Sequence, residues 1–113
     1  MTAPARGEVW VADLDPTRGH EQAGRRPVLV LSENLFNQGP AGLVIVLPLT
    51  STLRPIPSHV RVSPPDGGLK NESAALCEGI RSISKDRLLR RLGAVSSAKM
   101  RLVEDVLRIL LRL

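Results

Sequence analysis

A short segment between two apolar runs gathers much of the ionisable chemistry in this sequence. Residues 19–27, GHEQAGRRP, combine a histidine, a glutamate, a glutamine and two arginines with two glycines. Glu21 and Arg26 lie five residues apart, and the glycines allow bends that bring their side chains together. The carboxylate could then accept a proton from a hydroxyl, while the guanidinium stabilises charge that develops on a phosphorus centre.

Such a set of groups suits cleavage of a phosphodiester without a metal. In RNA the neighbouring 2′-hydroxyl can serve as the nucleophile, so an enzyme has only to position it, deprotonate it and neutralise charge. We expect no metal and no cofactor, because the sequence has neither metal-ligand spacing nor a glycine-rich strand-to-helix motif. A plainer interpretation stays open: charged residues in a loop often form only a solvated surface with a weak salt bridge.

The elements that must position these residues are predicted to be short strands. Loop residues 15–27 are punctuated by prolines and glycines. After them comes a run with near-continuous apolar character, which is typical of a strand buried on both faces. Residues 33–42 are expected to be a turn region with one helical turn. The predicted strands cover residues 8–14, 28–32, 43–50, 59–63 and 74–83.

The hydrophobic period changes towards the C-terminus. Ser84 is predicted to cap a short helix over residues 85–92, which ends at Gly93 before a last short strand over residues 93–96. From Ser97 the pattern predicts one helix to the C-terminus. The apolar stripe of this helix is wider than a small core needs. We favour core packing as the reason, with a partner chain as the second interpretation. The residues that widen the stripe are Leu102, Val106, Ile109 and Leu113.

Strands followed by helices, without alternating β-α-β units, predict a mostly antiparallel sheet in an α+β fold, curled into a small barrel with a C-terminal helix. The length of 113 residues indicates one domain, residues 1–113. The net charge of +5 favours an anionic partner such as nucleic acid. The single cysteine, Cys77, is expected to be buried. We find no signal-peptide pattern and no run long enough to span a bilayer, so we expect a cytoplasmic protein without a membrane partner.

The sequence resembles the MazF/PemK family, the toxins of bacterial type II toxin–antitoxin pairs. The resemblance covers nearly the whole chain. Its most specific part is EQAGRRPVLVLS, preceded by DLDPTRG. The other matching stretches are RGEVWVADL, VLPLTS, PSHVRV and LCEGIRSISKDRL.

The resemblance implies a fold, an activity and partners. The fold would be a small twisted antiparallel SH3-like barrel of the CcdB/MazF type, assembled as a homodimer. The activity would be that of a metal-independent, sequence-specific endoribonuclease. It would cleave single-stranded RNA to a cyclic phosphate and a 5′-hydroxyl, and so inhibit translation and growth. A cognate acidic antitoxin would wrap the dimer and block it.

The resemblance also assigns residues. Arg26 matches the family's catalytic arginine and Thr50 its catalytic threonine, while Glu21 matches a glutamate given a general-base role in some members. Gln22 matches a loop residue near the RNA. Because arginine stays protonated, we expect Arg26 to be an electrostatic clamp and Thr50 to donate a hydrogen bond to the phosphate. Which residue is general base and which is general acid stays open.

Two positions depart from the family's pattern. His20 stands where a small residue is common, and it could share in proton transfer, although an exposed loop histidine is the plainer interpretation. Gly79 stands where many relatives carry glutamine, which puts base selection in doubt. His59 is interpreted as structural or exposed. Arg25 and Arg81 are predicted RNA contacts, and further cations on the expected RNA path are Arg18, Arg61, Lys85 and Arg87.

Two other functions remain as alternatives. One is a CcdB-like protein that poisons DNA gyrase by protein–protein contact, and the other is an RNA-binding barrel without catalysis. The EQAGRR segment together with Thr50 favours the nuclease, because a pure binder has no need for that set of groups.

Overall fold

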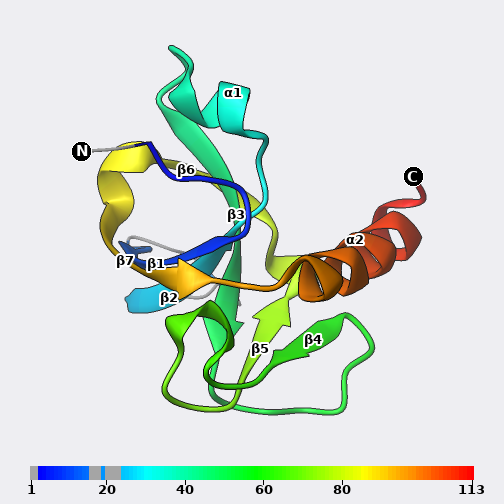
Figure 1. Ribbon diagram of the computed structural model, residues 1–113. Helices are drawn as coiled ribbons and strands as arrows, with labels where there is room; N and C mark the ends of the chain where they lie inside the picture. Colours follow the sequence, from blue (N-terminus) through cyan, green and yellow to red (C-terminus); the bar gives the residue numbers. More distant parts are fainter. Residues whose placement is uncertain (1–2, 16–18, 20–23) are drawn as a thin grey trace.

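The computed structural model describes residues 3–15, 19 and 24–113 of the chain (Figure 1). The two α-helices of this part are α1 (Asn34–Gln38) and α2 (Ser97–Leu111). Three short 3-10 turns are η1 (Asp66–Gly68), η2 (Cys77–Gly79) and η3 (Lys85–Arg87). The strands are β1 (Glu8–Asp13), β2 (Arg25–Val30), β3 (Leu43–Thr50), β4 (His59–Val62), β5 (Ser73–Leu76), β6 (Arg81–Ser84) and β7 (Leu88–Ala94).

The strands form one sheet in the order β4-β5-β3-β2-β1-β7, with β6 also paired to β3. Each described pairing is antiparallel. The turn η1, which follows β4, lies against β7. A Cβ added to Gly68 would stand 2.1 Å from the carbonyl oxygen of Leu92. The β4–β5 end of the sheet is thereby brought to the β7 end, as in a barrel, and the predicted antiparallel α+β fold is confirmed.

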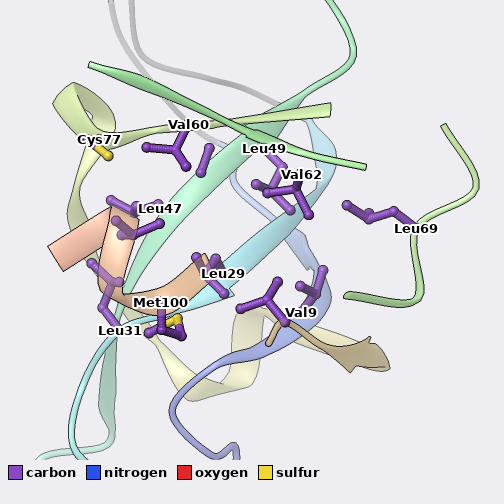
Figure 2. Close-up of a cluster of buried hydrophobic side chains, with 13 residues drawn as sticks. Val9, Leu29, Leu31, Leu47, Leu49, Val60, Val62, Leu69, Cys77 and Met100 are labelled. Atoms are coloured by element: carbon purple, nitrogen blue, oxygen red, sulfur yellow. The ribbon is translucent and has the colours of Figure 1, made fainter. Parts of the chain in front are cut away.

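The sheet encloses an aliphatic core. Figure 2 shows this core, which extends from Val9 and Leu69 to Cys77 and Met100. A second buried cluster, which includes Trp10, covers the other face of β1, β2 and β3. The middle strands β2 and β3 are therefore buried on both faces, as their continuous apolar runs predict.

Strand β2 begins earlier than predicted. Arg25 and Arg26 pair with Asp13 and Ala12 of β1, and Pro27 pairs with Val11, so these three residues belong to the strand and not to the loop. Pairing with β1 overrides the local loop signals of this segment.

The predicted strand over residues 74–83 is interrupted, and that prediction was wrong. Strand β5 pairs with the last residues of β3 and β6 pairs with its first half, while η2 lies between them. The interruption faces Pro48 of β3, which has no N–H to donate to a neighbouring strand. A Cβ added to Gly79 would stand 3.2 Å from Pro48 Cδ, so the turn packs closely on the proline ring.

The short helix predicted over residues 85–92 is also not formed as expected. The Ser84 hydroxyl accepts a hydrogen bond from the Asp86 amide at 3.3 Å, as a cap should, but the helical turn η3 covers only three residues. The chain then continues as β7, which pairs with β1. Pairing at the sheet edge outweighs the local helical pattern.

Helix α2 is confirmed. It begins at Ser97, and the Ser96 hydroxyl caps it by accepting a hydrogen bond from the Lys99 amide at 3.2 Å. Figure 1 shows its C-terminal turns extending beyond the strands. Met100 and Val103 are buried in the core, and Val106 packs against it. The other residues that widen the stripe are exposed, so core packing does not explain them: Leu102, Ile109 and Leu113 are 51%, 80% and 83% exposed. Within the described residues no helix is long and apolar enough to cross a membrane.

Candidate active site

The two principal predicted catalytic residues lie on adjacent strands. The pairing of β2 with β3 ends with Val28 opposite Pro48, and Arg26 and Thr50 each lie two residues beyond that pair. Residues an even number of positions apart in a strand share a face, so Arg26 and Thr50 are on the face of Val28 and Pro48. The sheet therefore makes near neighbours of two residues that are distant in the sequence.

Two grooves meet at Arg26 and Thr50, and both residues line each of them. The larger, which we call the main groove, has a volume of about 590 Å³. The smaller, which we call the side groove, has a volume of about 300 Å³ and is lined further by Thr52, Arg54, Ile56, His59, Leu76 and Glu78. Arg26 and Thr50 thus form the shared wall between two hollows.

The main groove is strongly positive. Four cations line it, Arg25, Arg26, Lys70 and Arg90, and no carboxylate is among its described lining residues. Such a groove attracts a polyanion through its long-range field. Sequence reasoning missed Lys70 and Arg90. Arg90 was assigned to a helix that is in fact β7, and Lys70 comes to the groove only because η1 packs on β7.

The Thr50 hydroxyl is placed so that it can donate a hydrogen bond. The residue is 9% exposed, and its Oγ1 accepts a hydrogen bond from the Thr52 amide at 3.1 Å. A hydroxyl that accepts from the backbone keeps its own hydrogen for another acceptor. This hydroxyl can therefore donate to an anionic oxygen placed beside Arg26.

The side groove contains a fixed carboxylate that sequence reasoning did not single out. The Ser58 hydroxyl donates to Glu78 Oε1 at 2.6 Å, and His59 Nε2 lies 2.7 Å from Glu78 Oε2. Burial by itself would raise the Glu78 pKa, but hydrogen bonds from Ser58, its own backbone amide and His59 outweigh burial and hold the pKa below its ordinary value. Glu78 is therefore ionised at neutral pH. The side chain of His59 is 6% exposed, so the structural interpretation of this histidine holds and the exposed one was wrong.

The other predicted site residues do not all lie at the two grooves. Arg25 lines the main groove as expected. Arg81 lies on β6 opposite Val46 and lines neither groove. His20, Glu21 and Gln22 lie outside the described residues.

Two cations of the expected RNA path instead bind the backbone of the protein. Arg87 donates to the carbonyls of Asp13, at 3.2 Å, and Asp15. Lys85 donates to the carbonyl of Asn37 at 2.7 Å. These contacts tie Arg87 to the end of β1 and Lys85 to α1, and neither side chain lines the main or the side groove, so their contact with RNA stays a prediction.

The chain is similar to known proteins over nearly its whole length. Residues 5–111 match the family described as PemK-like, MazF-like toxin of type II toxin–antitoxin system. Endoribonuclease MazF9 of Mycobacterium tuberculosis is 38% identical in an alignment of 109 residues, with 92% of this chain and 92% of that one covered.

Two solved structures share the fold. The crystal structure of MazF from Deinococcus radiodurans is 29% identical, with a TM-score of 0.89 over 100% of both chains. An endoribonuclease from a mycobacterial species, solved in complex with its cognate antitoxin, is 30% identical, with a TM-score of 0.78 over 100% of this chain and 97% of that one.

Proposed function

Because the chain belongs to the PemK-like, MazF-like toxin family of type II toxin–antitoxin systems, we propose that it is a metal-independent, sequence-specific endoribonuclease that cleaves single-stranded RNA and thereby inhibits translation and growth. The observation that carries this proposal is the placement of Arg26 and Thr50 together where the main and side grooves meet. A relative of 38% identity that is named an endoribonuclease supports it, and neither the gyrase poison nor the non-catalytic RNA-binding barrel needs that pair.

In the proposed reaction an RNA 2′-oxygen attacks the adjacent phosphorus and the bond from phosphorus to the 5′-oxygen breaks. The 2′-hydroxyl loses its proton to a base and the leaving 5′-oxygen gains one, which gives a cyclic phosphate and a 5′-hydroxyl. Arg26 stabilises the charge on the non-bridging oxygens, and the Thr50 hydroxyl donates to one of them. We retain Glu21 as the candidate base, with Gln22 and His20 as RNA contacts of the same loop.

The main groove would hold the RNA backbone. Arg25, Lys70 and Arg90 line it beside Arg26, and each can contact a phosphate. Binding should therefore weaken steeply as the salt concentration rises.

The same charge defines the inhibitor that we propose. A cognate antitoxin should carry a disordered acidic segment that folds on binding and sets carboxylates near Arg25 and Arg26. Steering by the positive groove predicts that salt slows its association more than it speeds its release. Stopped-flow association rates that do not change with ionic strength would contradict this.

We further propose that the protein acts in the cytoplasm as a homodimer. The exposed leucine and isoleucine side chains of α2, which its own core leaves uncovered, support a second chain on that surface. Light scattering coupled to gel filtration gives the mass directly, and a monomer at micromolar concentration would exclude the dimer.

Cleavage of a long RNA in the presence of a chelator tests the nuclease. Arg26→Ala should lower the cleavage rate about 100-fold to 1,000-fold, as loss of one preorganised charge donor does. Arg26→Lys keeps the charge but loses the forked geometry and should fall between. Arg101→Ala, an exposed arginine of α2 that lines neither the main nor the side groove, is the matched control and should cut at the native rate. If Arg26→Ala cleaved RNA at the native rate, the assignment of Arg26 as a catalytic residue would be wrong.

A further inference from the structure

The side groove has an ionised carboxylate close to the residues that are proposed to hold the scissile phosphate. Glu78 lines the side groove, which starts at Arg26 and Thr50, and its side chain is 45% exposed. Next to an RNA backbone a negative charge is repulsive, so it weakens binding unless it faces a hydrogen-bond donor of the RNA. In a single-stranded RNA such donors are the 2′-hydroxyls and the N–H groups on the edges of the bases.

The protein fixes this carboxylate and leaves part of it free. Ser58 and His59 occupy one acceptor position on each oxygen. A carboxylate offers about four such positions, so about two remain for a ligand. An unpaired flexible glutamate would lose side-chain entropy on binding, whereas Glu78 is already held in place.

His59 shows how the carboxylate is oriented. Its Nδ1 is buried and has no hydrogen-bond partner among the described residues. A buried N–H without an acceptor is rarer in proteins than a bare acceptor. Nε2 faces the carboxylate and donates to Glu78, which makes His59 a positioning residue and leaves Glu78 purely an acceptor.

The remaining walls suit a base. Leu76 and Ile56 supply apolar surface, and Arg54 presents a guanidinium, a group on which RNA bases stack. The volume of about 300 Å³ is at the lower end of small-ligand pockets. Since the side groove begins at the catalytic pair, its occupant belongs to a nucleotide next to the scissile phosphate.

Resting on the proposed nuclease function, we propose that the side groove is a nucleobase subsite in which Glu78 accepts a hydrogen bond from the exocyclic amino group of adenine, cytosine or guanine. Uracil is disfavoured there. It has no exocyclic amino group, and its ring N–H is flanked by two carbonyl oxygens that the carboxylate repels. The subsite therefore determines part of the cleavage sequence.

Mapping of cut sites in a random RNA pool tests the subsite. The wild-type protein should disfavour uracil at one position next to the cut. Glu78→Gln puts an amide donor where the carboxylate was, and it should reduce discrimination against uracil at that position alone by about tenfold or more. Glu72→Gln is the matched control, because Glu72 also accepts from a serine hydroxyl, that of Ser63 at 2.8 Å, but lines neither groove. Its cleavage pattern should be native.

A second measurement includes a test on the wild-type protein, which does not depend on the fold of the variant. A defined substrate for the wild-type protein is made with the amino-free analogue of the preferred base at that position. Cleavage by the wild type should fall about tenfold or more, and cleavage by Glu78→Gln should hardly change. Thermal unfolding of both variants shows whether Glu78→Gln is folded, and if it is not, the analogue substrate alone decides.

The outcomes separate the two proposals. If the wild-type protein cuts no RNA, the nuclease function fails and the subsite fails with it. If it cuts RNA without disfavouring uracil at any single position next to the cut, the subsite is overturned and the nuclease stands. A uniform loss of rate in Glu78→Gln with an unchanged sequence preference would also overturn the subsite, because Glu78 would then act on the reaction and not on the base.

Discussion

Replacing Gly68 by alanine should strongly destabilise the protein, because η1 lies so close to β7. Gly68 has φ +70°, and a Cβ there would stand 2.1 Å from the carbonyl oxygen of Leu92 and 2.6 Å from its carbonyl carbon. The left-handed backbone costs a residue with a Cβ about 1–2 kcal/mol. The clash is with main-chain atoms, so η1 must move away, at a cost on the order of 1–3 kcal/mol. The sum is about 2–5 kcal/mol.

A matched glycine separates these two costs. Gly42 has φ +71°, and a Cβ there would meet no atom within 4 Å, so Gly42→Ala has the backbone cost alone. At about 4 °C per kcal/mol for a domain of this size, Tm should fall by about 4–8 °C in Gly42→Ala and by about 8–20 °C in Gly68→Ala. Thermal unfolding followed by circular dichroism measures both. Equal losses would refute the close packing of η1 on β7.

Three further predictions concern the core and two ionisable groups. Val103 is fully buried, so Val103→Ala should lower the free energy of unfolding by about 2 kcal/mol, whereas Leu35→Ala, at an exposed position of α1, should change it by less than about 0.5 kcal/mol in urea titrations. Burial by itself would raise the Glu8 pKa, but hydrogen bonds from the Ala5 amide, Trp10 and Arg91 hold it below its ordinary value. The stabilisation by Glu8 is therefore present above its ordinary pKa and is lost as the pH falls through its pKa in the folded protein. Glu8→Gln should lower the free energy of unfolding at neutral pH and make that free energy fall less steeply below pH about 5, as urea titrations at several pH values can measure. An unchanged pH dependence in Glu8→Gln would contradict this. Burial, and then the Glu78 carboxylate, raise the Cys77 pKa to about 11, so iodoacetamide at about pH 8 should label Cys77 only after denaturation, as mass spectrometry can show.

The sequence predicts the middle of the sheet well because burial on two faces leaves a direct signal. The apolar run over residues 43–50 matches β3 residue for residue, and the predicted start of the C-terminal helix at Ser97 is the start of α2. The predicted catalytic pair, Arg26 and Thr50, came from the family resemblance, and the sheet register brings the two residues together.

The remaining errors come from contacts that no local pattern contains. The segment LLRRLGA has helical character on its own, and only the neighbouring β1 makes it a strand. Lys70 reaches the main groove through the contact between η1 and β7, and Glu78 becomes fixed only when residues 58 and 59 lie beside it. One available signal was overlooked: Pro48, inside a predicted strand, indicates that a neighbouring strand must be interrupted.

That interruption has a consequence for how such a toxin can evolve. Arg26 and Thr50 lie on paired strands, where a one-residue insertion would reverse the face of every following side chain. The turn η2 lies where the ladder is already broken opposite Pro48, so a changed residue there disturbs few sheet hydrogen bonds. We expect that descendants of this chain can alter η2, and with it the RNA sequence that they cut, while the groups that break the phosphodiester bond stay in place.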